Sequence, residues 1–277
     1  MDRKEIKAKI MKGFTIALPI VLVSILAVLI VVAMDISEEN SVPVFNDNLE
    51  ASSSSTNGNN DNLGTNGNEE EPNTSNNPED DSYSRGLSFA SNGDGTCALD
   101  GIGECTDTFI IVPPKSPNGD TVVAIANNAF KNCSQIKGIE FSEAVTTIGA
   151  YAFYCSNIRE ISIPSSVKAI GNCAFSGCKN LEVIEVDAGN KNYSSSSGVL
   201  YSKDGSTLIT YPAGKTDNFA IISRNVTTIS DMAFYRCNYV TKVTYHGTSA
   251  AWKRVDIGSG NDVLESATVY CAGDGTK

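Results

Sequence analysis

One apolar pattern occurs four times in this chain, and the repeat constrains the fold more than any other feature of the sequence. Each copy has an Ile, an Ala-Phe pair four and five residues later, a Cys, and then three spaced apolar positions. The copies begin at Ile125, Ile148, Ile170 and Ile229. A unit this short cannot bury its own apolar residues, and only stacked neighbours can cover them. The pattern therefore predicts a solenoid of stacked coils and not a closed globule.

Each repeat ends in an alternating apolar pattern, which predicts a strand with one buried face. The strand positions are Ile139 and Phe141, Ile161 and Ile163, Ile184 and Val186, and Val243 and Tyr245. At the head of each unit, around the Ala-Phe pair, we expect a turn and a short helix. The phenylalanine is the bulky side chain that fills each coil. The four predicted core phenylalanines are Phe130, Phe153, Phe175 and Phe234.

Four of the eight cysteines fall at one position of the repeat, namely Cys133, Cys155, Cys178 and Cys237. A repeated inward position favours buried thiols, because free Cys packs as a small apolar residue. Cys97 and Cys105 flank Asp100–Gly103, where we expect a hairpin turn, so a cross-strand disulfide between them is an open alternative. A metal site is not expected, because the chain has one His and no Cys-x2-Cys pair.

The repeat resembles the BspA-type leucine-rich repeat of bacterial surface proteins. The segment Ile161-Ser162-Ile163-Pro164-Ser165-Ser166-Val167 matches that repeat's strand and exit turn most closely. The resemblance implies an α/β fold, a right-handed leucine-rich-repeat solenoid with a parallel β-sheet on its concave face. It also implies a role in attachment to host or neighbouring-cell components.

The repeats lie in a folded region that we place at 85–277. An N-terminal cap (86–114) precedes them and a C-terminal cap (247–271) closes them, since open solenoid ends need covering. Trp252 is interpreted as a core residue of the second cap, with a ligand platform as the alternative. Between the third and fourth copies lies an insertion at 187–217, where alternating apolar residues around Lys203-Asp204-Gly205 predict a β-hairpin.

The N-terminal region has the pattern of a membrane anchor. Residues 14–34 form an uncharged run of 21 residues, and about 20 apolar residues are enough to span the hydrocarbon core. Five basic residues precede the run and acidic residues follow it. The positive side stays inside, so we expect 1–13 to be a cytoplasmic tail, 14–34 a signal-anchor helix, and the rest to be extracellular. A cleaved signal peptide is the alternative.

Residues 35–84 are expected to be a disordered acidic linker. The segment is rich in Asn, Ser and Gly, and it carries 12 acidic residues and no basic ones. Low hydrophobicity with charge of one sign opposes folding. The net charge is −12 for 35–84 and only −2 for 85–277, within the total of −11. The acidity therefore belongs to the linker and not to the repeats.

We find no pattern of catalytic residues, so we do not expect an enzyme, and we predict no cofactor. Nucleic acid is not an expected partner, because the folded region has no basic stripe. The expected function is adhesion, meaning recognition of an extracellular protein or glycan by the outward residues of the strands. A non-catalytic envelope scaffold that self-associates is the alternative. The candidate binding residues are Lys137, Glu140, Arg159, Glu160, Ser162, Glu182, Glu185, Lys242 and Thr244.

Overall fold

The computed structural model of the protein describes residues 82–275. The predicted cytoplasmic tail (1–13), the membrane helix (14–34) and all but the last residues of the linker (35–84) lie outside this range. Between residues 82 and 275, no helix combines the length and the apolar character needed to cross a membrane.

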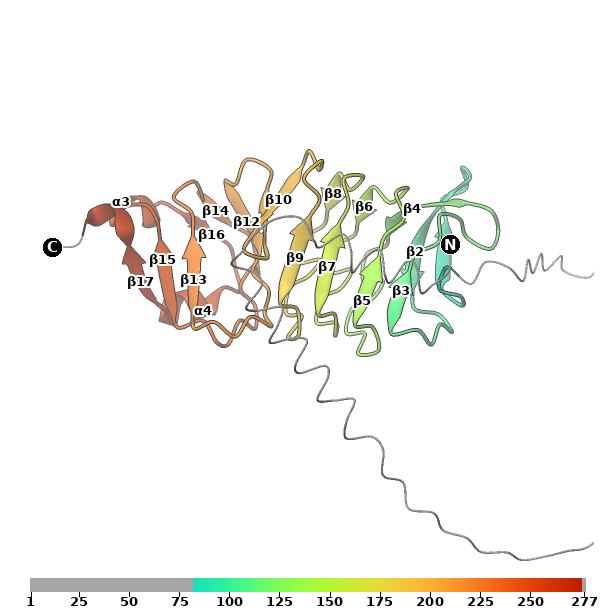
Figure 1. Ribbon diagram of the computed structural model, residues 1–277, viewed down its shortest axis with the longest axis horizontal. Helices are drawn as coiled ribbons and strands as arrows, with labels where there is room; N and C mark the ends of the chain where they lie inside the picture. The colour runs from blue at the N-terminus through green and yellow to red at the C-terminus, as the bar shows by residue number, and fades with distance from the viewer. Residues whose placement is uncertain (1–81, 276–277) are drawn as a thin grey trace, which may run out of the picture. The chain divides into compact units, whose positions relative to one another are not determined.

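The described residues form a β-solenoid whose coils each contribute one strand to a broad face (Figure 1). We call these the long strands. They pair in parallel within three sets, β3 with β5, β7 with β9, and β13 with β15 and β17. The predicted alternating segments therefore do form stacked parallel strands. Their bounds are β3 (Phe109–Ile111), β5 (Gly138–Glu140), β7 (Glu160–Ile163), β9 (Val183–Val186), β13 (Phe219–Ile222), β15 (Lys242–Tyr245) and β17 (Thr268–Cys271).

A second, narrower set of strands runs along another side of the coils, and apart from the inserted hairpin it was not predicted. It begins in an antiparallel hairpin, β1 (Ser88–Ser91) with β2 (Thr96–Gly101). The strand orders are β1-β2-β4-β6-β8 and β10-β11-β12-β14-β16. The remaining members are β4 (Thr121–Ile125), β6 (Thr147–Ile148), β8 (Ala169–Ile170), β10 (Tyr193–Ser196), β11 (Val199–Ser202), β12 (Thr207–Thr210), β14 (Thr228–Ile229) and β16 (Asp256–Ile257).

The predicted short helix at the head of each repeat is wrong. Between residues 82 and 275, helix occurs only near the C-terminal end, as α3 (Ser249–Trp252), α4 (Asp262–Ser266) and the 3₁₀ turn η1 (Ala272–Asp274). The Ala-Phe segments are turns because the backbone is left-handed two residues before and two residues after each phenylalanine, which an α-helix cannot accommodate. These positions are Asn128 and Asn132, Tyr151 and Cys155, Cys173 and Gly177, and Met232 and Arg236.

The core is a column of aromatic rings inside the coils. All four predicted phenylalanines are at most 1% exposed. Phe153 stacks on Phe130 and on Phe175, with ring centroids 5.3 and 5.6 Å apart. Past the insertion, Phe234 stacks instead on Tyr211 at 4.9 Å. The buried residues form two clusters, one extending from Leu87 to Leu200 and the other from Val199 to Leu264, which meet at β11.

The prediction of buried thiols holds for Cys178 and Cys237, whereas Cys133 is only half-buried and the second repeat places another residue at the column position. Ser156, and not Cys155, lies three residues after its phenylalanine, and it is 2% exposed. Its hydroxyl contacts the Cys178 sulfur at 3.5 Å. Cys155 is displaced to the left-handed position beside it, with φ of 56°. The shorter second repeat lacks a residue after Ser156, so counting from Ile158 shifted the column by one.

Cys97 and Cys105 are separate buried thiols in the structure. The hairpin of this cap closes at Asn92–Gly95 and not at Asp100–Gly103, because β1 and β2 flank the former segment. Cys97 lies opposite Ser91 in that hairpin. The two cysteines therefore do not sit across a shared turn, which was the reason for considering a disulfide between them.

The insertion forms a three-stranded meander. β10 pairs with β11 and β11 with β12, both antiparallel, and β12 then joins the parallel strand β14. The predicted turn at Lys203-Asp204-Gly205 is present, and β10 is an additional strand. The Asp204 carboxylate accepts hydrogen bonds from the Ser202 hydroxyl (2.6 Å) and from the Ser206 hydroxyl (2.8 Å) and amide (3.0 Å). These bonds lower the pKa of Asp204 to about 2.

Candidate functional site

The outward side chains of the long strands form one surface, which we call the long-strand face. In β7 and β13 burial alternates, and the first and third residues point outward. In β3 and β5 the corresponding residues Ile111 and Gly138 are buried. Within each set of paired strands, the residues at the first and third positions lie side by side, and the sets together give two rows. The first row is Phe109, Gly138, Glu160, Val183, Phe219, Lys242 and Thr268, and the second is Ile111, Glu140, Ser162, Glu185, Ile221, Thr244 and Tyr270.

The structure brings the nine candidate binding residues to this face. Six of them are in the two rows, namely Glu140, Glu160, Ser162, Glu185, Lys242 and Thr244. The other three directly precede their strands and are linked by backbone hydrogen bonds. The Arg159 amide donates to the Lys137 carbonyl at 2.9 Å, and the Glu182 amide donates to the Arg159 carbonyl at 2.8 Å. Lys137, Arg159 and Glu182 therefore form a third row beside the other two.

Two carboxyl groups of this face are partly removed from water. Burial raises the pKa of Glu140, and one of its carboxyl oxygens is buried without a hydrogen-bond partner. Burial also raises the pKa of Glu185, with a smaller contribution from the negative charge of Glu160. A low-dielectric environment disfavours the charged form of an acid. The face is therefore not a fully solvated acidic surface.

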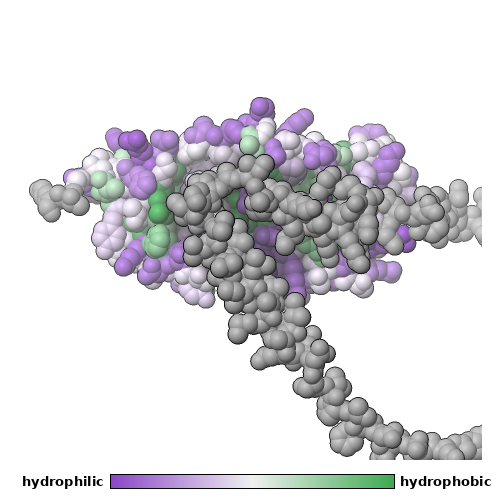
Figure 2. Space-filling view, in the orientation of Figure 1, coloured by the Kyte–Doolittle hydropathy of each residue, from purple (hydrophilic) through white to green (hydrophobic). Residues whose placement is uncertain are grey.

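The sequence reasoning missed the exposed apolar residues of the face. Phe109, Phe219, Ile221 and Tyr270 all occupy outward positions, with 37, 44, 52 and 55% of their surface exposed. Phe219 and Ile221 are on one strand, and Figure 2 shows apolar surface near β13 and β15. The segment Phe219-Ala220-Ile221-Ile222 is apolar at outward and inward positions alike. That departure from alternation was a signal we could have used.

A groove with a volume of about 480 Å³ lies between the inserted strands and β13. It joins the long-strand face at Phe219 and Ile221. Its size is within the ~300–1,000 Å³ of typical ligand pockets. The residues that line it are Ser194, Ser196, Ser197, Val199, Tyr201, Gly205, Tyr211, Lys215, Asp217, Phe219, Ile221, Ser223, Asn225 and His246.

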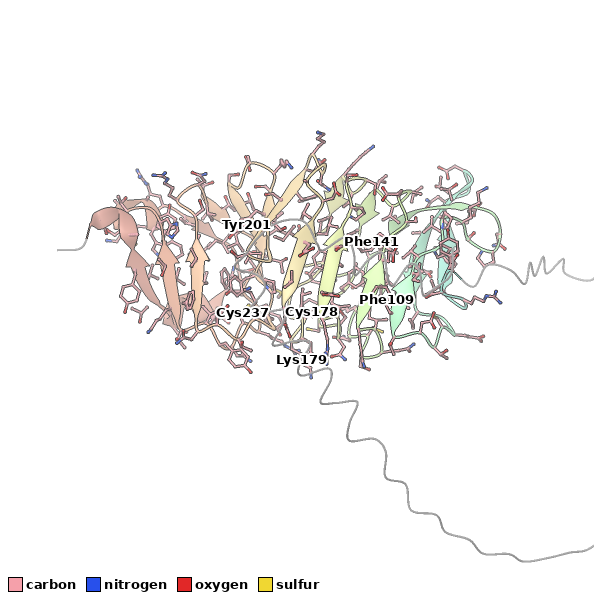
Figure 3. The ribbon with its side chains drawn as sticks, in the orientation of Figure 1. Phe109, Phe141, Cys178, Lys179, Tyr201 and Cys237 are labelled. Atoms are coloured by element: carbon pink, nitrogen blue, oxygen red, sulfur yellow. The ribbon has the colours of Figure 1, made fainter. Side chains whose placement is uncertain are left out.

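Two buried tyrosines belong to the groove, at the point where the two core clusters meet. Tyr201, labelled in Figure 3, comes from β11, and Tyr211 directly follows β12. The Tyr211 hydroxyl donates to the Phe219 carbonyl at 3.4 Å. Burial raises the pKa of Tyr201 to about 12, and it raises the pKa of Tyr211 as well. Both phenols are neutral near pH 7, and the two side chains form part of the groove wall.

The chemistry of this groove is suited to binding. It has serine hydroxyls, the aromatic rings of Tyr201, Tyr211 and Phe219, one amide side chain, and the charged residues Lys215 and Asp217. His246, the one histidine of the chain, is also at the groove. Among residues 82–275, no three His, Cys, Asp or Glu side chains are grouped so that they could hold a metal ion.

Comparison with known proteins places these observations in a family. The profile described as "BspA type Leucine rich repeat region" matches residues 115–220 and 215–251, in six copies. No curated protein sequence matches the chain.

Several solved structures are similar over part of the chain. The pneumococcal vaccine antigen PcpA is 27% identical, with a TM-score of 0.46, over 50% of this chain and 34% of the other. A leucine-rich cell surface protein of Faecalibacterium prausnitzii is 28% identical, with a TM-score of 0.44, over 50 and 35%. A leucine-rich repeat protein of Eubacterium ventriosum is 27% identical, with a TM-score of 0.42, over 60 and 54%. This chain thus spans about a third of the length of the first two proteins.

The matched repeats and the stacked parallel strands agree on one assignment. The family profile begins near β4 and ends in α3, so it covers the coils that carry the long-strand face from β5 to β15. The chain therefore belongs to the BspA-type leucine-rich-repeat proteins.

Proposed function

We propose that this chain is a cell-surface binding protein that attaches to an extracellular protein or glycan through its long-strand face. The observation that carries the proposal is the presence of exposed Phe219, Ile221 and Tyr270 among charged side chains on that face. Exposed apolar residues that gather on one surface mark interaction sites. Solenoids of this kind use long, stacked surfaces to bind partners.

The proposal includes a membrane tether. The uncharged run at 14–34 would hold the chain in the membrane, and the acidic linker at 35–84 would separate the repeats from it. Basic residues before the run favour an extracellular position for the repeats. A binding surface on such a tether is available to molecules outside the cell.

The charged residues of the face give a direct test. The full chain in detergent micelles is immobilised and exposed to matrix proteins, mucins, glycans and cell-wall fragments. A variant with Arg159→Glu and Lys242→Glu reverses two charges on the face. The matched control, Lys168→Glu with Lys253→Glu, makes the same charge change at exposed positions outside the long strands.

We expect one class of ligand to bind the parent and the control, and to bind the face variant at least about tenfold more weakly, as for loss of one or two charged contacts. Equal binding by all three proteins would remove the long-strand face as the site. A chain that bound only further copies of itself would instead support the envelope-scaffold alternative.

A further inference from the structure

β13 is an edge strand that borders the groove. In the sheet order β13-β15-β17, it pairs with β15 on one side, and within residues 82–275 no strand pairs with its other side. That other side faces the inserted strands across the groove that Phe219 and Ile221 line. An unpaired edge presents a row of backbone donors and acceptors to whatever lies beside it.

Hydrogen bonds show which backbone groups face the groove. The carbonyls of Asn218 and Ile222 accept from the amides of Lys242 and His246, so they face β15. Successive residues of a strand direct their backbone groups to opposite sides. The amide and carbonyl of Phe219 and Ile221 therefore face the groove. The hydrogen bond of the Tyr211 hydroxyl to the Phe219 carbonyl, at 3.4 Å, agrees with this direction.

The other strand beside the insertion does not have an open edge. The Ile184 amide in β9 donates to the Gly198 carbonyl at 2.9 Å, and the Val186 amide donates to the Ser195 hydroxyl at 3.1 Å. The inserted strands thus satisfy the edge of β9. They leave a groove, and not a paired strand, on the side of β13.

From these contacts we propose that the groove receives an extended polypeptide segment of a partner, which adds to the edge of β13 as a strand. The inference rests on the proposed binding function and specifies the ligand of the same face. Main-chain hydrogen bonds to Phe219 and Ile221 hold the segment, as in other complexes formed by strand addition. Four residues of β13 at ~3.3 Å each provide about 13 Å of edge.

The side chains around this edge define the sequence that it accepts. Outward residues of the added strand lie beside Phe219 and Ile221, where aromatic or branched apolar side chains form favourable cross-strand pairs. Inward residues contact the rings of Tyr201 and Tyr211. The ligand is therefore a short segment with apolar residues at alternate positions and no proline at the paired positions. A glycan offers no regular row of backbone amides and carbonyls, so the edge does not favour it.

The experiment uses a phage-displayed library of random nonapeptides, panned against the full chain in detergent micelles. Enriched peptides are synthesised, and each backbone nitrogen is methylated in turn. We expect alternate methylations to weaken binding by about tenfold or more, because each removes one main-chain hydrogen bond. Methylation at the intervening positions changes little, since those amides face away from β13.

A protein variant tests the same hydrogen bonds from the other side. Ile221→Pro removes an amide that faces the groove and does not take part in pairing with β15, and proline is tolerated at such edge positions. It should weaken the enriched peptides about tenfold, whereas Ile221→Val, which keeps the amide, should change their affinity less than about threefold. The methylated peptides remain informative if Ile221→Pro does not fold.

Two results would overturn the proposal. One is no enrichment above phage that display no peptide. The other is enrichment of peptides that tolerate methylation at every position, which would mean recognition by side chains alone. Either result leaves the proposed binding function intact if the charge-reversal variant of the face still loses a matrix or glycan ligand.

Discussion

Phe153 is the residue whose replacement should cost this fold the most. Its side chain is fully buried, it stacks on Phe130 and Phe175 at 5.3 and 5.6 Å, and it meets Phe141 edge-on at 6.3 Å. Phe→Ala in a core costs about 3–5 kcal/mol, and each aromatic pair adds about 0.5–1.5 kcal/mol beyond its buried area. We therefore expect Phe153→Ala to lower the free energy of unfolding by about 4–5 kcal/mol, the upper part of that range.

Phe153→Leu separates stacking from burial. Leucine fills most of the space, so the loss should fall to about 1–3 kcal/mol, mainly from the three ring contacts. Both variants are measured in residues 80–277, the compact unit that contains every described strand. Urea unfolding is followed by far-UV circular dichroism and by Trp252 fluorescence, and the free energies come from a fit in which the N-terminal and C-terminal clusters can unfold separately.

The fluorescence of the single tryptophan reports on unfolding at the C-terminal end of the solenoid. Trp252 packs against Tyr245 at 5.2 Å in the C-terminal cluster, whereas Phe153 belongs to the N-terminal cluster. Phe153→Ala should shift the circular dichroism transition more than the Trp252 fluorescence transition. Phe234→Ala should shift the fluorescence transition at least as much as the circular dichroism transition. A loss below about 2 kcal/mol for Phe153→Ala would refute the reasoning from burial and stacking.

Three further perturbations follow from other sites. Burial raises the pKa of Cys178 to about 11 and of Cys237 to about 12, so at pH 8 both should react with a thiol reagent at least about 100-fold more slowly than free cysteine. The rates are measured by mass spectrometry, and in the control, protein unfolded in urea, the two cysteines should react as fast as free cysteine. Equal rates in the folded protein would contradict the prediction. Asn132 has φ of 58° at an exposed position, so Asn132→Gly should leave stability nearly unchanged and Asn132→Val should lower it by about 1–2 kcal/mol, and thermal unfolding checks both. The pKa of Glu140 is raised by burial, so its ionisation as pH rises through the folded-state pKa costs stability. Glu140→Gln should therefore stabilise the protein at pH 7, and the gain should vanish below about pH 4. A gain that persisted in acid would point to packing and not to charge.

The sequence was sufficient for the parts of the fold that repeat an apolar spacing. The long strands lie where the alternating pairs predicted them, because period-two alternation over a half-buried strand is a strong signal. The short strands of the second set were missed, since a two-residue strand such as Thr147–Ile148 has no alternation to detect. The helix predicted around Ala-Phe failed because left-handed residues, among them Tyr151 and Met232, are not types that spacing or propensity would select for that backbone.

The candidate site also has a part that the sequence predicts and a part that it does not. The alternating pattern was enough to place Glu160 and Lys242 on one face. Once the buried positions of a strand are known, the residues between them point outward. The groove was not predictable, since it depends on how the insertion packs against β9 and not against β13. That packing rests on specific bonds, such as Ile184 to Gly198, between residues that no repeat relates. Cys155 was misplaced because a spacing rule cannot locate a one-residue deletion within a turn.

The division of the core at the insertion also determines how the protein carries mechanical load. The column of Phe130, Phe153 and Phe175 does not continue into the pair of Tyr211 and Phe234, and across the insertion the Tyr154 ring stacks on the Tyr235 ring at 5.8 Å. On the long-strand face, the ladder of paired strands is interrupted between β9 and β13, as it also is between β5 and β7, so the insertion is where breaks in the core and in the ladder coincide. Because each coil of a solenoid is held only by its neighbours, tension applied along the stack is concentrated at this joint. Force applied to the two ends of the stack would open the joint first, and the two blocks on either side would extend in separate steps.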